Sequence, residues 1–352
     1  ELINALPEEL YNITLVLLDS DNEYAYRLKK NVNIVQLTFN SSFAKSLVSM
    51  YAFPAKVLKK LSVNSFIAYY DFISNCVTNV FEKTYDIAID FYGYGSFVTA
   101  FLATKIQAKK KATWLHDEKP YWMKSVQKYL CEYDKIYGVS QAVVDAFCRE
   151  YPHYKDKAAV FYNVIDIEEI KRKSEQDEII PFKESFNIVT VGRLTEQKGY
   201  DIAIKAASIL KKRKINFAWY AIGGGRDEKK LKKLVEKYCL ENQFVFLGRK
   251  KNPYPYMKHC DLYVQPSRHE GYVITLVEAR ALCLPILSSD IPSAREQIQD
   301  GINGYVAELS AEDLADKIEY LYNNPSQRKK TVEYLKEHPI DFSTELLKLE
   351  II

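Results

Sequence analysis

Several features that mark particular protein classes are scarce in this 352-residue sequence. Its six cysteines stand far apart and form no CxxC pair, a spacing that fits neither a typical zinc site nor a dense disulfide framework. Most of them lie in apolar segments, where cysteine behaves as a small core residue. They are Cys76, Cys131, Cys148, Cys239, Cys260 and Cys283. The cysteines therefore predict a reduced, cytoplasmic protein.

No apolar run approaches the ~20 residues that a membrane-spanning helix needs. The opening residues ELINALPEEL resemble the end of a helix rather than a signal peptide. Because no Met stands first, we expect further residues upstream. A GxxxxGK[ST] motif is also missing, which excludes a P-loop kinase.

Charge of one sign is not in excess, since the formal net charge is +3. This argues against a dedicated nucleic-acid-binding protein, which usually carries a strongly basic domain. Lysines do cluster locally, within residues 56–60 and 105–111. We interpret both clusters as solvated faces, with contact to an anionic membrane surface as the alternative.

The chain is long, and apolar and amphipathic segments alternate along it. Short apolar runs alternate with amphipathic segments, a pattern that predicts parallel β-sheets buried on both faces. Strands are expected at 12–19, 32–38, 85–91, 111–117, 135–140, 158–164, 187–193, 216–225, 244–249, 261–267, 285–290 and 304–308. Helices are expected at 65–83, 125–133, 199–213, 311–322 and 326–337, with a Lys-rich helix after residue 225.

The length and the charged stretch after Asn163 predict two domains. We place the first at 1–165, a linker at 166–185, the second at 186–338, and a last helix within 339–352 that returns toward the first domain. Both domains are predicted to be doubly wound, Rossmann-like α/β units, whose parallel sheets face an inter-domain cleft. Ligands of such sheets bind beyond the carboxyl ends of the strands.

Two loops of the second domain could meet phosphate. In VGRLTEQKG (191–199), a strand end and the following loop present Arg193 and Lys198, a planar fork and a mobile point charge. A solvated loop is an equal alternative. In AIGGGRDE (221–228), three glycines allow backbone to approach a ligand, although a tight turn explains them better.

The stretch HEGYVITLVEARA (269–281) carries two glutamates with seven residues between them. Helical periodicity begins near Tyr272, so the free N–H groups of residues 272–275 should offer a diphosphate site. Glu278 could then accept hydrogen bonds from a ribose diol, and Glu270 could address a sugar hydroxyl. Alternatively, Glu270 only favours the helix N-terminus and Glu278 is a surface carboxylate.

Taken together, these motifs resemble the GT-B retaining glycosyltransferases of the large group often called family 4, or glycosyl transferases group 1. The resemblance covers the second half of the chain, in the same order and with the same separations as in the family. It rests on VGRLTEQKG, GGG, FLGR, DLYVQPS, EGYVITLVEA and DGINGYVAE.

The resemblance implies a role for each matched residue. Arg193 and Lys198 would hold the donor diphosphate, together with backbone N–H groups of Val273, Ile274 and Thr275. Glu270 would be catalytic and contact the transferred sugar. Glu278 would bind the ribose, and Arg249 and Lys250 begin the segment that reads the base.

In the first half, KATWLHDE resembles the strand end that places a catalytic histidine, here His116, in the family's cleft. A lone histidine at a strand end is otherwise usually structural. Family members also open with a strand and a Gly-rich loop that this sequence does not show, which leaves acceptor binding open. Asp19-Ser20-Asp21 is a DxD, which holds a metal in another glycosyltransferase fold; we interpret it here as a solvated turn.

The resemblance implies transfer of a sugar from a nucleoside diphosphate to a hydroxyl, with retention and with no required metal or cofactor. UDP is the favoured donor nucleotide and GDP the alternative. The expected acceptor is a saccharide or lipid-linked saccharide for bacterial cell-surface polysaccharide, such as capsule or lipopolysaccharide.

The basic, aromatic-rich first half adds the inner membrane surface as an expected partner. An ordinary buried helix explains the same aromatic residues, Phe66, Tyr69, Tyr70 and Phe72, equally well. Other functions stay open: a nucleotide-sugar epimerase, a phosphorylase whose pyridoxal lysine we cannot identify, and a non-catalytic binding subunit.

Overall fold

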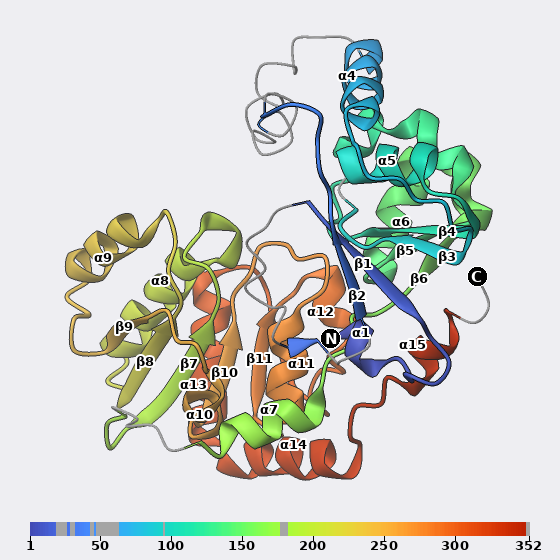
Figure 1. Ribbon diagram of the computed structural model, residues 1–352. Coiled ribbons are helices and arrows are strands. Elements are labelled where there is room, and N and C mark those ends of the chain that lie inside the picture. Colours follow the sequence, from blue (N-terminus) through green and yellow to red (C-terminus); the bar gives the residue numbers. More distant parts are fainter. Residues whose placement is uncertain are drawn as a thin grey trace. The chain divides into compact units, whose positions relative to one another are not determined.

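A computed structural model describes residues 1–18, 27–28, 32–42, 46, 63–93, 96–176 and 182–349 (Figure 1). The chain divides into two compact units. The first contains Glu1–Val164 together with Phe342–Ile352, and the second contains Ile165–Asp341.

The second unit is built on a six-stranded sheet in the order β12-β11-β10-β7-β8-β9. All of its strand pairs are parallel. The strands are β7 (Phe186–Val191), β8 (Phe217–Ile222), β9 (Phe244–Gly248), β10 (Leu262–Gln265), β11 (Ile286–Ser289) and β12 (Tyr305–Ala307). The order runs outward in both directions from β7, as in a doubly wound sheet.

Helices cover both faces of this sheet (Figure 1). They are α7 (Ile167–Ser174), α8 (Tyr200–Lys212), α9 (Glu228–Lys237), α10 (Tyr254–Lys258), α11 (Ile274–Ala281), α12 (Pro292–Arg295), α13 (Ala311–Asn323) and α14 (Pro325–Glu337). Along β8, Trp219 belongs to the core under α8 and α13, whereas Tyr220 belongs to the core under α10 and α11. Side chains alternate between the two faces of a strand, so every residue of β8 is buried.

The first unit contains a four-stranded parallel sheet in the order β3-β4-β5-β6 and a separate parallel pair, β1-β2. The strands are β1 (Ile13–Leu17), β2 (Val32–Gln36), β3 (Tyr85–Asp90), β4 (Ala108–Leu115), β5 (Lys135–Gly138) and β6 (Ala158–Val160). Helices α1 (Leu2–Ala5), α4 (Val63–Asn75), α5 (Phe97–Lys105) and α6 (Gln141–Glu150) belong to the same unit. Trp114 lies at its centre, fully buried, with its ring centroid 4.8 Å from that of Tyr137.

The predicted α/β class with parallel sheets in two Rossmann-like units is confirmed. Three local predictions are wrong. The segment 125–133 forms short 3₁₀ helices, η2 (Pro120–Ser125) and η3 (Gln127–Glu132), instead of an α-helix. The helix predicted to reach residue 83 ends at Asn75, because Val77 forms a β-bridge with Phe39.

The linker predicted at 166–185 contains the third error, since helix α7 lies within it. Asp166 caps this helix by accepting a hydrogen bond from Glu169 N at 2.9 Å. Acidic residues occupy its first turn and basic residues its last, and these charges stabilise the helix through its dipole. Ile170 is buried, and α7 contacts α10 and α11. The segment is therefore part of the second unit rather than a connector.

The tail contains a short helix, α15 (Ser343–Leu347), which lies with the first unit. Glu345 accepts a hydrogen bond from Tyr162 N at 2.9 Å, and Tyr137 donates to Lys348 O at 3.2 Å. These contacts join the tail to the residues around β5 and β6.

Candidate active site

The loop after β7 delivers Lys198 to a buried carboxylate. The loop closes at Gly199, whose φ of 66° is left-handed and whose missing Cβ would lie 1.8 Å from Pro266 O. Only glycine fits this backbone position. Lys198 Nζ lies 2.6 Å from Glu270 Oε1, and the two side chains are only 14% and 9% exposed. The ion pair thus joins the β7 loop to the segment before α11.

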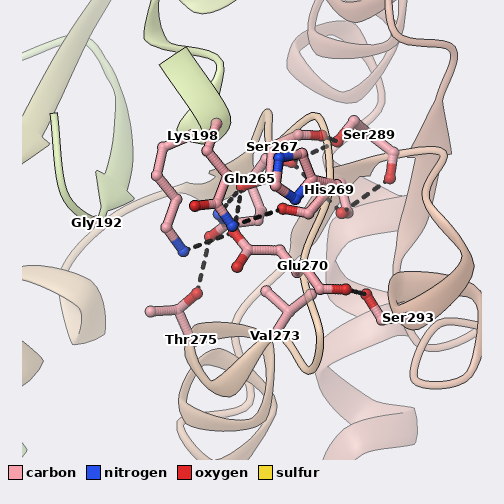
Figure 2. Close-up of polar contacts among 12 residues, drawn as sticks. Gly192, Lys198, Gln265, Ser267, His269, Glu270, Val273, Thr275, Ser289 and Ser293 are labelled. Carbon is pink, nitrogen blue, oxygen red and sulfur yellow. Dashed lines mark hydrogen bonds and ion pairs between the residues drawn. The ribbon is translucent and has the colours of Figure 1, made fainter. Parts of the chain in front are cut away.

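Glu270 is held from both ends (Figure 2). Its Oε1 accepts hydrogen bonds from Lys198 and from Ser267 Oγ, both at 2.6 Å. Its backbone carbonyl accepts one from Ser293 Oγ at 2.9 Å. Within the described chain, Oε2 has no hydrogen-bond partner, and it is not among the fully buried polar atoms without one. One carboxylate oxygen is therefore committed to the protein, and the other is open to a ligand.

Helix α11 begins at Ile274, two residues later than predicted. Val273 is the N-cap residue, and its carbonyl accepts from Leu276 N at 3.0 Å. Ile274 N donates to Tyr272 O at 3.1 Å, so this amide is partly engaged. For the amides of Val273 and Thr275, we find no acceptor in the parts of the chain that the structure describes. Two of the three predicted phosphate-binding amides therefore keep free donors.

The three glycines at 223–225 have a packing role, which favours the tight-turn interpretation. A Cβ on Gly223, whose φ is 145°, would lie 1.9 Å from Gly192 O. One on Gly225 would lie 2.4 Å from Leu194 O. The missing side chains therefore allow the turn after β8 to pack closely against the loop that carries Arg193 and Lys198.

The other predicted nucleotide contacts lie on the same unit. Glu278 is half-buried on α11, and its Oε1 accepts from Tyr254 OH at 2.9 Å. Arg249 and Lys250 are exposed after β9, and Lys250 Nζ lies 5.1 Å from the centroid of the Tyr256 ring. The Arg193 side chain is exposed and makes no ion pair with any residue that the structure describes.

His116 lies in the first unit, directly after β4. Its Nε2 is 2.8 Å from Phe91 O, and burial lowers the pKa of the imidazole below its ordinary value. The neighbouring Asp90 is fully buried and accepts hydrogen bonds from Thr99, Thr113 and Gly93 N. Burial raises the pKa of Asp90 despite these bonds. Asp90 thereby fixes the loop on which Phe91 O meets His116.

Sequence reasoning missed Asp90 and the hydroxyl and amide groups behind Glu270. Asp90 ends the apolar strand YDIAID, and Gln265 ends LYVQ just before Ser267. A polar residue at the carboxyl end of a buried parallel strand was the available signal. Ser293 gave none, because it comes from a helix 23 residues beyond Glu270.

Two kinds of feature are absent from the residues that the structure describes. No helix there is both long and apolar enough to cross a membrane. No group of three or more His, Cys, Asp or Glu side chains there could hold a metal ion. The DxD at Asp19-Ser20-Asp21, all of the lysines in 56–60 and the side chain of Phe66 lie outside the described residues.

Comparisons with known proteins relate the second unit to a described family. Residues 171–338 match the family described as Glycosyl transferases group 1. The chain is similar to an uncharacterized glycosyltransferase of Methanocaldococcus jannaschii, with 33% identity over 172 residues, 48% of this chain and 40% of that protein. The family match lies within the second unit and covers most of it.

Two further proteins extend the comparison. A Campylobacter jejuni relative is 30% identical over 184 residues, 49% of each chain; it is named N-acetylgalactosamine-N,N'-diacetylbacillosaminyl-diphospho-undecaprenol 4-alpha-N-acetylgalactosaminyltransferase. The structure of Anabaena HepE in complex with UDP and glucose has a TM-score of 0.69 and 18% identity, covering 96% of this chain and 90% of that one. The fold is therefore GT-B. The chain spans about half the length, or less, of these two sequence relatives.

Proposed function

We propose that this protein is a retaining glycosyltransferase that moves a sugar from a nucleoside-diphosphate sugar to a hydroxyl group. The observation that carries the proposal is the buried Lys198–Glu270 ion pair beside the first turn of α11. A cation, free helix amides and a carboxylate with one open oxygen are the groups that a sugar diphosphate needs.

The arrangement accounts for stabilisation of the leaving group. Lys198 Nζ has three N–H donors, of which Glu270 uses one, so two can face a phosphate. The amides of Val273 and Thr275 add donors at a helix N-terminus, where the helix dipole favours negative charge. Arg193, exposed on the same loop, supplies a bidentate fork. Preorganised donors of this kind act on the charge that grows as the diphosphate departs.

Glu270 would then contact the sugar through Oε2, because Oε1 is saturated. Glu278 would accept from the ribose, and the segment at Arg249 and Lys250 would face the base. In a retaining transfer, the bond from the anomeric carbon to the diphosphate oxygen breaks and the bond to the acceptor oxygen forms on the same face. The departing phosphate oxygen takes the acceptor proton, and His116 would lie near the acceptor. No step in this scheme requires a metal or cofactor.

We favour UDP as the donor nucleotide, and GDP stays the alternative. The bound UDP of the Anabaena structure supports this choice. A lipid-linked saccharide of cell-surface polysaccharide synthesis is the proposed acceptor, supported by the diphospho-undecaprenol in the name of the Campylobacter relative. We also propose that the protein works in the cytoplasm, at the inner face of the membrane.

The direct test is a transfer assay with UDP- and GDP-sugars, without added metal and with EDTA, against undecaprenyl-diphosphate-linked saccharides. We expect the reaction to produce nucleoside diphosphate and a lengthened saccharide in equal amounts. Proton NMR of the product should show the anomeric configuration of the donor. An inverted configuration would contradict retention. Conversion of the nucleotide sugar without any acceptor would favour an epimerase.

A further inference from the structure

Gln265 occupies the last position of β10 and is fully buried, yet both ends of its amide are used. Its Oε1 accepts from Tyr263 OH at 2.7 Å and from Thr275 Oγ1 at 2.8 Å. Its Nε2 donates to Ser267 Oγ at 2.7 Å. Figure 2 shows Gln265 between Ser267 and Thr275. One side chain thus reaches the loop toward Glu270 and the first turn of α11.

The donor and the acceptor are fixed for each hydrogen bond in the series that runs from Glu270 through Ser267 to Gln265. The Glu270 carboxylate can only accept, so Ser267 Oγ donates its single proton to Glu270 Oε1, 2.6 Å away. The Ser267 oxygen must therefore accept from Gln265 Nε2, which leaves Gln265 Oε1 to accept from the hydroxyl groups of Tyr263 and Thr275. Ser267 is also fully buried, and its backbone carbonyl accepts from Ser289 Oγ. Buried groups satisfied in this way hold a unique geometry.

We propose that Gln265 is a positioning residue that sets the Glu270 carboxylate and the first turn of α11 relative to each other. The inference rests on the proposed function for its catalytic meaning. Glu270 would address the sugar and the amide of Thr275 the diphosphate, so their spacing decides whether the bond to the leaving group is aligned. No apolar residue of similar length can make the hydrogen bonds that the oxygen and the nitrogen of this amide make, and a carboxylate cannot donate to Ser267.

The first experiment reads geometry without substrate. Hydrogen–deuterium exchange of peptides covering 266–276 is compared in wild type, Gln265→Met and Thr190→Val. Thr190 is the matched control, because it is 1% exposed on the adjacent β7 and donates to Val264 O at 2.7 Å. We expect faster exchange of 266–276 in Gln265→Met and unchanged exchange there in Thr190→Val. Equal exchange in all three proteins would overturn the inference.

The second experiment is a double-mutant cycle in the transfer reaction. Misplacement of reacting groups by about 1 Å can cost on the order of 10²-fold in rate, so Gln265→Met should lower kcat far more than it changes the donor KM. Ser267→Ala added to Gln265→Met should lower kcat little further, because both substitutions interrupt the same series of hydrogen bonds. Ser267→Ala added to Thr190→Val should give the product of the two single effects.

Failure of the positioning role and failure of the proposed function give different results. Multiplicative effects of Gln265→Met and Ser267→Ala, in an active enzyme, would overturn the positioning role. If the wild type transfers no sugar, the proposed function fails, and the exchange experiment alone decides whether Gln265 orders 266–276.

Discussion

Lys198 Nζ and Glu270 Oε1 lie 2.6 Å apart although the residues are 72 positions apart in the chain. Both side chains are largely buried. A buried ion pair is weak evidence for stability, because desolvation of two charges offsets much of their attraction. We therefore explain this pair by what it presents to a ligand, an oriented ammonium group and an open carboxylate oxygen.

Removing one partner of the pair should destabilise the second unit. Lys198→Met leaves the Glu270 carboxylate buried without its cation, which typically costs about 3–5 kcal/mol. The double variant Lys198→Met/Glu270→Gln removes both charges and should recover most of that loss. Urea unfolding followed by fluorescence measures both values. A double variant as unstable as the single one would contradict this explanation of the pair.

Glu278 should recognise the ribose. Hydrogen bonds to a charged group contribute about 1.5–3 kcal/mol, so Glu278→Ala should weaken UDP binding by roughly 10- to 100-fold. The affinity for 2′,3′-dideoxy-UDP should change little, because this analogue lacks the diol. Calorimetric titration of both nucleotides gives the comparison. Equal weakening of both would place Glu278 elsewhere in the site.

Gly199 and Gly301 offer a matched test of backbone requirements. Both have positive φ, 66° and 77°, but a Cβ on Gly199 would collide with Pro266 O, while one on Gly301 meets nothing within 4 Å. Gly301→Ala should cost about 1–2 kcal/mol from the left-handed conformation alone. Gly199→Ala should cost more and also displace Lys198. Denaturant unfolding of the two variants measures the difference, and equal costs would contradict the close approach.

His116 should be neutral at pH 7. Burial lowers its pKa, and the contacts with Phe91 O and Asp90 oppose this only in part. In the unfolded chain the imidazole has its ordinary pKa, about 6.5. As the pH falls below that value, the unfolded state binds the proton first, so His116 lowers the free energy of unfolding in acid. NMR titration of the imidazole signal, assigned with His116→Gln, should give a midpoint below 6.5; one at or above 6.5 would contradict this.

The sequence predicted the parallel sheets, because buried strands of this kind are apolar throughout. Every residue of FAWYAI in β8 is buried, and the periodicity of α8 and α13 was equally plain. The boundary of α11 was harder to predict. Val273 continues the apolar stripe, but its carbonyl caps the helix, so the period alone set the start two residues early.

The sequence singled out Lys198 and Glu270, which the structure brings together, but not the neutral residues behind them. Lys198 and Glu270 fit a motif whose chemistry is legible from residue type. That they form one ion pair depends on Gly199 lying against Pro266, a tertiary contact that no local pattern encodes. Gln265 and Ser267 are ordinary residues in an apolar strand and its turn, and only their hydrogen bonds reveal their place.

Calorimetric titration of UDP and GDP into the wild type, Lys198→Ala and Lys232→Ala tests the proposed donor site most directly. Lys232 is the control, because its ion pair with Glu228 is exposed on α9. We expect one nucleotide to bind the wild type and Lys232→Ala alike. Lys198→Ala should bind it at least about tenfold more weakly, because one charged hydrogen bond is lost. Equal affinity of all three proteins would show that the diphosphate does not lie at Lys198.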